Sequence, residues 1–419
     1  MRVLMVSWEY PPVVVGGLGR HVHALATELA AAGHDVVVLS RQPAGSDATT
    51  HPTSVEALDG VRVLRVAEDP PHLEFERDMV AWTLAMGHGM LRAALTRLVP
   101  EWRPDVVHAH DWLVAHPAIA LADVLAVPLV ATIHATEAGR HAGWLSSALS
   151  RQVHSVEWWL ARRADTLITC SAAMRAEVAE LFDVDAGPIE VLHNGIAPRR
   201  WRATAARVRA VRERYAPGAA PVLLYFGRLE YEKGVQDLIA ALPRIRRAHP
   251  GTRLLVTGTG TAHDQLVAAV GKHRVRRSVT FTGHLPDGDL PALLHAVDAV
   301  VLPSRYEPFG IVALEAAAAG APLVASTAGG LGEVVLDGET GLSFAPGDVA
   351  GLAGAVGALL AGPAAAARRA RAARKRLGSA FDWGRIAGDT ASVYARATRG
   401  GAAEPGRPKI PTGNVFGRS

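Results

Sequence analysis

Two acidic and two basic residues carry the clearest chemistry in this sequence. Glu307 and Glu315 bracket the segment Glu307-Pro-Phe-Gly-Ile-Val-Ala-Leu-Glu315, in which a loop is expected to lead into a helix. Gly310 lets a ligand approach the backbone closely, and the free N–H groups at a helix start attract negative charge. A loop carboxylate binds neutral hydroxyls, so the segment suits a sugar that carries phosphate.

The two basic residues lie in Phe226-Gly-Arg-Leu-Glu-Tyr-Glu-Lys-Gly234, at the end of an expected strand. Arg228 offers planar, bidentate contacts and Lys233 a mobile point charge, so together they suit a diphosphate. The alternative is a surface pair without a function. The flanking glycines, Gly227 and Gly234, make this segment unlike a plain surface turn.

A glycine-rich loop, Gly16-Gly17-Leu-Gly19, follows the first expected strand and precedes a helix. It allows close approach of an acceptor or a phosphate. A dinucleotide fingerprint needs a third glycine at fixed spacing, but Arg20, His21 and Val22 follow Gly19. A nicotinamide-dependent dehydrogenase is therefore disfavoured.

Histidines mark the ends of two further strands. In His108-Ala-His110-Asp111-Trp112 the two imidazoles share one face of a strand, which is compatible with metal binding. No further ligands follow at tight spacing, so we expect His108 to be packed and His110 and Asp111 to face a cleft. Asp111 could then accept a sugar hydroxyl proton. His134 stands just past the next strand and is expected to be functional.

Length and composition indicate a two-domain enzyme. The chain has 419 residues, 49% of them hydrophobic and 20% charged, with 41 glycines. The net charge of +4 comes without a basic patch interleaved with aromatics, which argues against nucleic acid. Cys170 is the only cysteine and favours a reducing compartment. The apolar start predicts a buried strand rather than a signal peptide, and no apolar run reaches bilayer length.

Alternating strand and helix patterns predict a doubly wound α/β fold. Continuous apolar runs are typical of parallel strands that are covered on both faces. Residues 19–32 are expected to form a helix that ends at Gly33. The expected strands of the first half are 2–7, 35–39, 61–66, 105–108, 128–133, 165–169 and 189–192, and those of the second half are 222–226, 253–257, 278–281, 298–301 and 322–325.

The pattern restarts after Asn194-Gly195 and predicts two domains. Residues 1–197 form the first and 198–380 the second, while a helix at 381–398 is expected to cross back to the first. The Gly- and Pro-rich residues 399–419 are expected to be disordered. Ligands of doubly wound sheets bind at the carboxyl ends of the strands, so the functional loops should meet between the domains.

These elements, in this order, resemble a retaining glycosyltransferase of the GT-B fold, in the glycogen-synthase-like family. That fold consists of two Rossmann-like domains that face each other across a cleft. The resemblance covers nearly everything before residue 399. Its finer features are similar to bacterial α-(1→4)-glucosyltransferases that elongate glycogen or methylglucose lipopolysaccharide: Ser7-Trp-Glu-Tyr-Pro-Pro, His108-Ala-His-Asp-Trp and Arg305-Tyr-Glu-Pro-Phe-Gly.

The resemblance also implies roles for single residues. Arg228 and Lys233 neutralise the donor diphosphate, Glu307 binds sugar hydroxyls and Glu315 holds the ribose. His134 and Asp111 face the donor sugar from the first domain. The other donor-binding positions that it implies are Gly16, Gly17, Asn194, Gly258, Gly283, His284, Leu285, Phe309, Gly310 and Ile311.

One departure bears on the donor. Synthases that use ADP-glucose typically carry a lysine two positions before the first-loop Gly-Gly, where this chain has Val14. UDP-glucose is therefore favoured and ADP-glucose stays open. No metal and no cofactor is expected, because cationic side chains hold the phosphates. The Asp-x-Asp matches at Asp183 and Asp287 lie outside the expected site loops.

The expected partners are a nucleotide-glucose and an α-glucan acceptor, in the cytoplasm. Weak peripheral membrane contact through Trp158-Trp159 beside Arg162-Arg163 is a minor alternative to their burial. Within the class, a mannosyltransferase acting on a lipid or inositol acceptor stays open. A sugar-nucleotide isomerase of related fold and a non-catalytic glycan-binding relative are the alternatives outside it.

Overall fold

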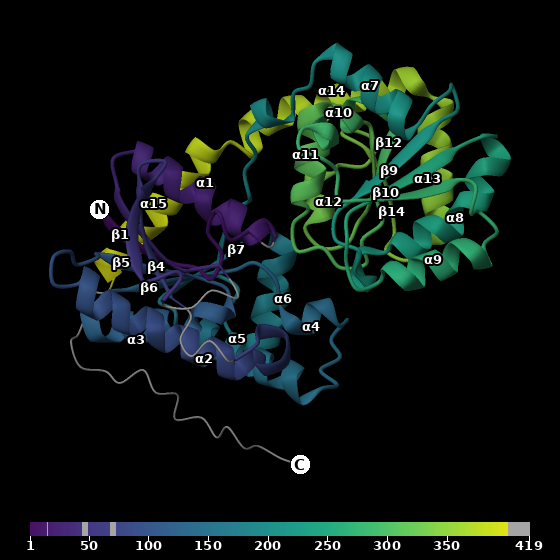
Figure 1. Cartoon of the computed structure of the whole chain (residues 1–419). Coiled ribbons are helices and arrows are strands. Elements are labelled where there is room, and N and C mark those ends of the chain that lie inside the picture. The colour runs from purple at the N-terminus through teal and green to yellow at the C-terminus, as the bar shows by residue number, and fades with distance from the viewer. Residues whose placement is uncertain (15, 44–48, 68–72, 401–419) are drawn as a thin grey trace.

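The computed structural model describes residues 1–14, 16–43, 49–67 and 73–400, which form two lobes, each built on a sheet (Figure 1). The first sheet has the order β3-β4-β2-β1-β5-β6-β7-β8. Its strands are β1 Arg2–Val6, β2 Asp35–Arg41, β3 Ser54–Leu58, β4 Val61–Val66, β5 Val106–His110, β6 Leu129–Ile133, β7 Thr166–Thr169 and β8 Glu190–Val191.

The second sheet has the order β11-β10-β9-β12-β13-β14, and all its pairs are parallel. Its strands are β9 Val222–Phe226, β10 Arg253–Thr257, β11 Val279–Gly283, β12 Ala299–Leu302, β13 Leu323–Ser326 and β14 Leu342–Phe344. The predicted two doubly wound sheets are thereby confirmed.

Helices cover both faces of the first sheet, because alternate strand residues point to opposite sides. Val3 and Met5 of β1 pack with residues of α1 and α15, whereas Leu4 and Val6 pack with residues of α2 and α3. The helices of this half are α1 Gly17–Ala31, α2 Phe75–Ala93, α3 Ala115–Leu125, α4 Glu137–Arg140, α5 Ala148–Arg163 and α6 Ala172–Phe182.

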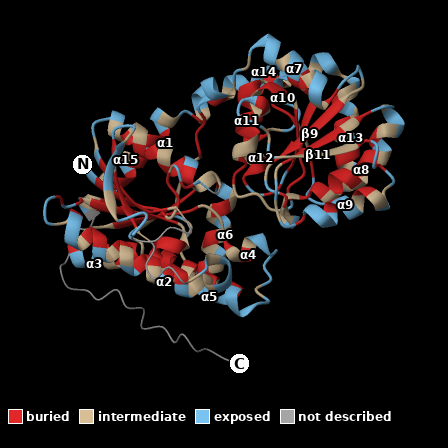
Figure 2. Ribbon diagram, in the orientation of Figure 1, coloured by how far each residue is buried: buried red, intermediate tan, exposed pale blue. Residues whose placement is uncertain are grey.

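The second sheet is covered in the same way, and Figure 2 shows the strands of both sheets as the most buried parts of the chain. Leu223 of β9 packs with α8, α9 and α13, and Leu224 packs with α10 and α11. The helices are α7 Ala205–Tyr215, α8 Val235–Ala248, α9 His263–Lys272, α10 Asp289–Ala296, α11 Ile311–Ala319, α12 Leu331–Val334, α13 Val349–Ala361, α14 Pro363–Ala380 and α15 Trp383–Gly400.

Strands β3 and β14 were not predicted. β3 pairs with β4 in antiparallel orientation at the edge of the sheet, and its residues are mostly exposed. An exposed edge strand lacks the continuous apolar run on which the strand predictions rest. The dipeptide Asp59-Gly60 between β3 and β4 is nevertheless a sequence signal for a hairpin. β14 has only 3 residues. Gly33, with φ of +90°, ends α1 as expected.

Helix α15 returns from the second half of the chain to the first sheet. It packs beside α1, and the Tyr394 hydroxyl lies 2.7 Å from Nδ1 of His108 in β5. The predicted helix at 381–398 is thus observed two residues later, at Trp383–Gly400. The domain limit at 197/198 stays a prediction, and residues 401–419 of the expected disordered tail lie outside the described residues.

Among the described helices, none is by itself long and apolar enough to cross a membrane. One bent pair, Val349–Ala361 with Pro363–Arg399, meets the length and composition of a span, with a bend of 102° between its two parts.

Candidate active site

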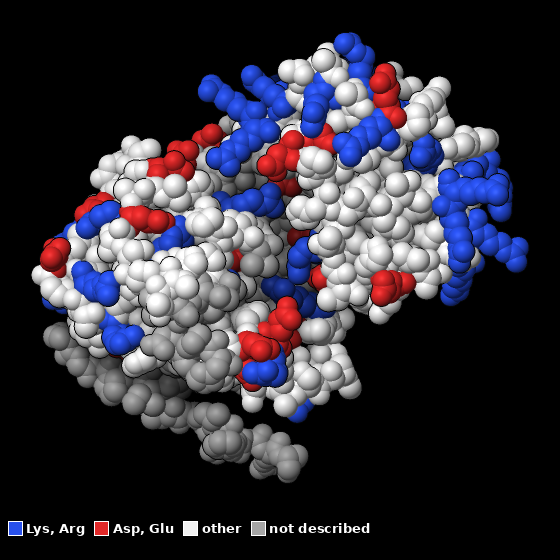
Figure 3. Space-filling view, viewed as in Figure 1, with Lys and Arg blue, Asp and Glu red and all other residues white. Residues whose placement is uncertain are grey.

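Loops from the carboxyl ends of both sheets meet in a groove between the lobes, in which basic side chains gather (Figure 3). On the side of the second domain, Lys233 Nζ lies 2.9 Å from Glu307 Oε2. Both side chains are largely buried, with 16% and 12% of their surface exposed. Sequence analysis predicted both residues, and the fold brings them into direct contact although they are far apart in the sequence.

Arg228 lies in the same loop as Lys233 with nearly half of its side chain exposed, and its guanidinium lies 3.5 Å from Glu232. The loop after β10 packs on the same turn, since Gly227 N donates to Thr257 O and Gly258 N donates to Gly283 O. Gly258 and Gly283 therefore lie next to the Arg228 turn. His284 is exposed and Leu285 half-buried, at the outer end of this group of loops.

The predicted helix entry at Gly310 is confirmed. Gly310 precedes α11 with φ of +102°, a conformation that favours glycine, and no side chain caps the helix. The first N–H groups of α11 are thus left for a ligand. Phe309 is buried under this turn, and Ile311 begins the helix.

Glu315 lies inside α11, is almost completely buried, and pairs with Arg20 of α1. Burial raises the pKa of Glu315, and the charge and hydrogen bond of Arg20 lower it. The start of α1 also abuts α11, because a Cβ added at Gly17 would stand 2.9 Å from Cδ1 of Ile311. Gly16 precedes α1 without a side-chain cap. Gly16, Gly17 and Glu315 are therefore brought together from opposite domains.

On the side of the first domain, buried histidines form a cluster. His110 Nδ1 and His134 Nε2 are 3.2 Å apart, and His21 Nδ1 lies 2.6 Å from Asn194 Oδ1. Burial lowers the pKa of His134 to about 4 and the pKa of His21 and His110 well below 6.5. All three imidazoles are neutral at pH 7.

Asp111 is half-buried and supports the backbone of His134. Its Oδ1 accepts a hydrogen bond of 2.7 Å from the backbone N–H of His134. Asp111 also has φ of +63°, a strained value for a residue other than glycine. Burial raises the pKa of Asp111 to about 7, and the N–H groups of His134 and Ala135 and the charge of Arg140 oppose that shift.

The expectation that His110 faces the cleft is wrong, because His110 has no exposed surface. The ring of His108 lies over that of His110, with centroids 4.1 Å apart, so both imidazoles share one face as predicted. His108 is packed as expected and is held by Tyr394 and Thr132.

The three nitrogen-bearing side chains of His21, His110 and His134 could hold a metal ion, since their ligand atoms lie within 4.8 Å of one another. Nε2 of His21 and Nε2 of His110 lack a hydrogen-bond partner. The donor set fits a cation that prefers imidazole, such as Zn²⁺. In this geometry such an ion would occupy His134 and compete with its predicted contact to a sugar.

Several contacts tie the two domains together near the site. The Tyr306 hydroxyl donates to Glu177 Oε1 at 2.8 Å, and Ser171 Oγ donates to Pro308 O at 2.7 Å. Glu333 accepts hydrogen bonds from the first N–H groups of α6. The loop Glu307–Phe309 is therefore held against the first domain.

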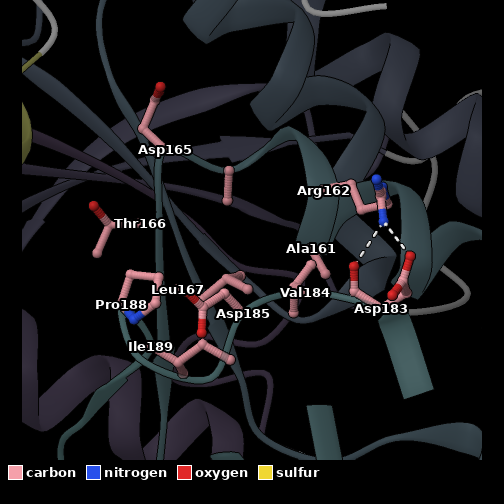
Figure 4. Close-up of a pocket in the computed structure, with 11 residues that line it drawn as sticks. Ala161, Arg162, Asp165, Thr166, Leu167, Asp183, Val184, Asp185, Pro188 and Ile189 are labelled. Atoms are coloured by element: carbon pink, nitrogen blue, oxygen red, sulfur yellow. Dashed lines mark hydrogen bonds and ion pairs between the residues drawn. The ribbon is translucent and has the colours of Figure 1, made fainter. Parts of the chain in front are cut away.

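A separate hollow of about 340 Å³ lies at the amino end of β7 (Figure 4). Arg162 on its wall donates to the backbone oxygen of Asp183 at 2.7 Å. Asp183 and Asp185, one of the two Asp-x-Asp matches, line this hollow. Because all the predicted site loops follow the carboxyl ends of strands, this hollow lies apart from them.

Sequence reasoning missed Arg20, His21, Glu177 and Tyr306 as site residues. Arg20 and His21 directly follow the glycine loop, in the first turn of α1, and that position is a usable signal. The sequence offers no such signal for Glu177, because it lies on α6 and reaches the site through tertiary contacts with Thr136 and Tyr306.

Comparison with known proteins identifies the family of the chain. The family described as Glycosyltransferase Family 4 matches residues 15–200, and the one described as Glycosyl transferases group 1 matches residues 209–376. The chain is 62% identical over 416 residues to a glycogen synthase of Mycobacterium tuberculosis, covering 98% of both chains. It is 33% identical to an alpha-maltose-1-phosphate synthase of the same organism, covering 94% of this chain and 99% of that one.

Among solved structures, a sucrose-phosphate synthase from Thermosynechococcus elongatus matches with a TM-score of 0.80 and 25% identity, over 95% of this chain and 99% of that chain. These matches extend over both lobes and over every loop of the site. The chain therefore belongs to the group 1 glycosyltransferases of the GT-B fold and is a hexosyltransferase related to mycobacterial glycogen synthase.

Proposed function

We propose that this protein transfers glucose from a nucleotide-glucose to the non-reducing end of an α-(1→4)-glucan, with retention of the anomeric configuration. The 62% identity to a glycogen synthase supports a glucan product. UDP-glucose is the favoured donor, because Val14 stands where synthases that use ADP-glucose carry a lysine. The cytoplasm is the proposed location, where both substrates would be available.

The observation that carries this function is the Lys233–Glu307 pair, with Arg228 in the same loop as Lys233, together with the uncapped start of α11. A diphosphate placed there meets two cations and the positive end of a helix. Glu307 is then free to accept from sugar hydroxyls. Charge that grows on the departing phosphate is stabilised more than the charge of the bound donor, which is the condition for a faster reaction.

The proposed reaction balances without a nucleophile from the protein. The bond between the anomeric carbon and the β-phosphate oxygen breaks, and the acceptor hydroxyl forms its bond on the same face of the sugar. The acceptor proton passes to the departing phosphate oxygen. Arg228 and Lys233 hold the negative charge of the nucleoside diphosphate. His134, neutral at pH 7, orients the sugar. We propose that no metal is needed.

A donor-by-acceptor matrix tests this proposal. Purified protein is incubated with UDP-, ADP- and GDP-sugars and with maltooligosaccharides, glycogen, glucose 1-phosphate or inositol phosphate, and product linkage is determined. We expect release of UDP, with new α-(1→4) bonds on glucan acceptors. Absence of nucleotide release from UDP- and ADP-glucose with every glucan would refute the function. Release from a GDP-mannose donor would favour a mannosyltransferase.

A further inference from the structure

The ion pair between Arg20 and Glu315 joins the two domains at the predicted ribose site. Arg20 lies in the first turn of α1, and its Nη1 contacts Oε1 of Glu315 in α11. The two partners differ in exposure, because 51% of the Arg20 side chain is exposed and 4% of the Glu315 side chain. Arg20 can therefore turn away into the groove, whereas Glu315 is fixed.

A buried carboxylate without a partner is costly, so Glu315 needs a donor group at all times. Burial raises its pKa and Arg20 lowers it, which means that Arg20 favours the charged form. Arg20 supplies that donor group. Ribose hydroxyls that bind Glu315 would replace Arg20 and leave its guanidinium without an anion.

The next anion would be the diphosphate of the same nucleotide. In a nucleotide the ribose is bonded directly to the first phosphate, so a guanidinium released from the ribose site remains within reach of that phosphate. The starts of α1 and α11 also abut, as the 2.9 Å approach of a Gly17 Cβ to Ile311 shows. Guanidinium groups bind phosphate oxygens in bidentate fashion.

We propose that Arg20 is a donor-binding residue that exchanges the Glu315 carboxylate for the donor diphosphate when the nucleotide binds. It supplies from the first domain the cation that is missing at Val14, and it complements Arg228 and Lys233 of the second domain. This inference rests on the proposed function, because it assumes a nucleoside diphosphate donor. With a cation supplied by Arg20, the absence of a lysine at position 14 counts less against ADP-glucose as the donor.

If Arg20 exchanges partners in this way, its removal should have opposite effects on the affinities of two ligands. A nucleoside has a ribose but no phosphate, so it must displace Arg20 without offering a new anion. Removing Arg20 then leaves nucleoside binding unchanged or tighter. A nucleoside diphosphate offers the new anion, and its binding becomes weaker when Arg20 is removed. A residue that merely held the two domains together would change both affinities in the same direction.

Isothermal titration calorimetry on the full chain tests this, using UDP with uridine, or ADP with adenosine if the wild type binds ADP more tightly. For Arg20→Ala we expect the Kd of the diphosphate to rise at least tenfold and the Kd of the nucleoside to stay equal or fall. Arg20→Lys should recover part of the diphosphate affinity. Arg62→Ala is the matched control, since Arg62 is a similarly exposed arginine paired with Asp35 on the surface. Glu315→Gln should weaken both ligands.

Equal losses for nucleoside and diphosphate in Arg20→Ala, or no loss for the diphosphate, would overturn the inference. Circular dichroism and thermal unfolding of the variant show whether it is folded, and Arg20→Gln provides a second neutral variant. A wild type that releases no nucleotide from nucleotide-glucose refutes the proposed function. An active wild type with an unaffected Arg20→Ala variant refutes this inference alone.

Discussion

The phenol oxygen of Tyr306, in the second domain, lies 2.8 Å from Glu177 Oε1, in the first. The same oxygen accepts a hydrogen bond of 3.3 Å from the backbone N–H of Thr136, two residues after His134. Glu177 in turn accepts from the Thr136 hydroxyl. Tyr306 directly precedes Glu307, so this contact fixes the Glu307 loop relative to the His134 loop.

Replacing Tyr306 by Phe should weaken the contact between the two domains. The change removes a hydrogen bond to the Glu177 carboxylate and leaves the Thr136 N–H without this acceptor. The loss is roughly 1–2 kcal/mol, which corresponds to a 5- to 30-fold decrease in kcat/KM. Small-angle scattering should show a larger radius of gyration for the variant. If neither kcat/KM nor the scattering changed, the contact between the two domains would not depend on this hydrogen bond.

Lys233 and Glu307 should behave as one unit. Removal of either side chain leaves an unpaired and largely buried charge in the donor site. We expect Lys233→Ala and Glu307→Ala each to lower kcat at least a hundredfold without loss of fold, and the double variant to be little worse than either single one. Measuring kcat and circular dichroism for the two single variants and the double variant completes this double-mutant cycle. If the fold decrease in kcat of the double variant equalled the product of the two single decreases, the two residues would act independently.

The histidine cluster gives a test of the metal-free proposal. Treatment with EDTA should leave the transfer rate unchanged within about twofold, since no step needs a metal ion. Added Zn²⁺ should inhibit, because His21, His110 and His134 can bind it together and His134 is then withdrawn from the sugar. His21→Asn should weaken this inhibition at least tenfold. Loss of activity in EDTA that Zn²⁺ restores would contradict the prediction.

The fold and the loops that carry Arg228, Lys233 and Glu307 could be predicted because they depend on local signals. Continuous apolar strands and glycine-marked turns indicate parallel sheets, and topology then brings Lys233 and Glu307 to one sheet edge. Edge strand β3 could not be predicted from an apolar run, because it is mostly solvent-exposed and its apolar pattern is weak.

The contacts between domains could not be predicted from the sequence. Arg20 has an ordinary position on the first turn of a helix, and only the packing of α1 against α11 places it on Glu315. The hydrogen bond from the His134 N–H to the Asp111 carboxylate likewise follows from the backbone conformation at Asp111 and was not predicted. Such roles depend on tertiary geometry, which local patterns do not encode. The contact of Asp111 with a substrate stays a prediction.

Asp111 should give the enzyme a rising pH dependence near neutrality. Burial raises the pKa of Asp111 to about 7 and lowers the pKa of His134 to about 4. Burial, with a smaller contribution from the charge of Asp111, raises the pKa of Glu157 to about 8. The ionised carboxylate accepts the His134 N–H more strongly than the neutral acid does, so His134 is better held above pH 7. We expect kcat/KM to rise up to tenfold per pH unit below 7 and then level off.

The effect on stability has the opposite sign. An acid whose pKa is raised by folding binds its proton more tightly in the folded state, so the stability it contributes is complete below pH 4 and is lost as the pH rises through 7. Asp111→Asn keeps an oxygen acceptor for His134 N–H but cannot ionise. At pH 8 it should therefore be more stable than the wild type by up to about 4 kcal/mol, with a flat activity profile near pH 7. Urea unfolding measures the stability and initial rates measure the activity profile, each from pH 5 to 9. If the variant kept the wild-type inflection of activity near pH 7, that inflection would belong to another group.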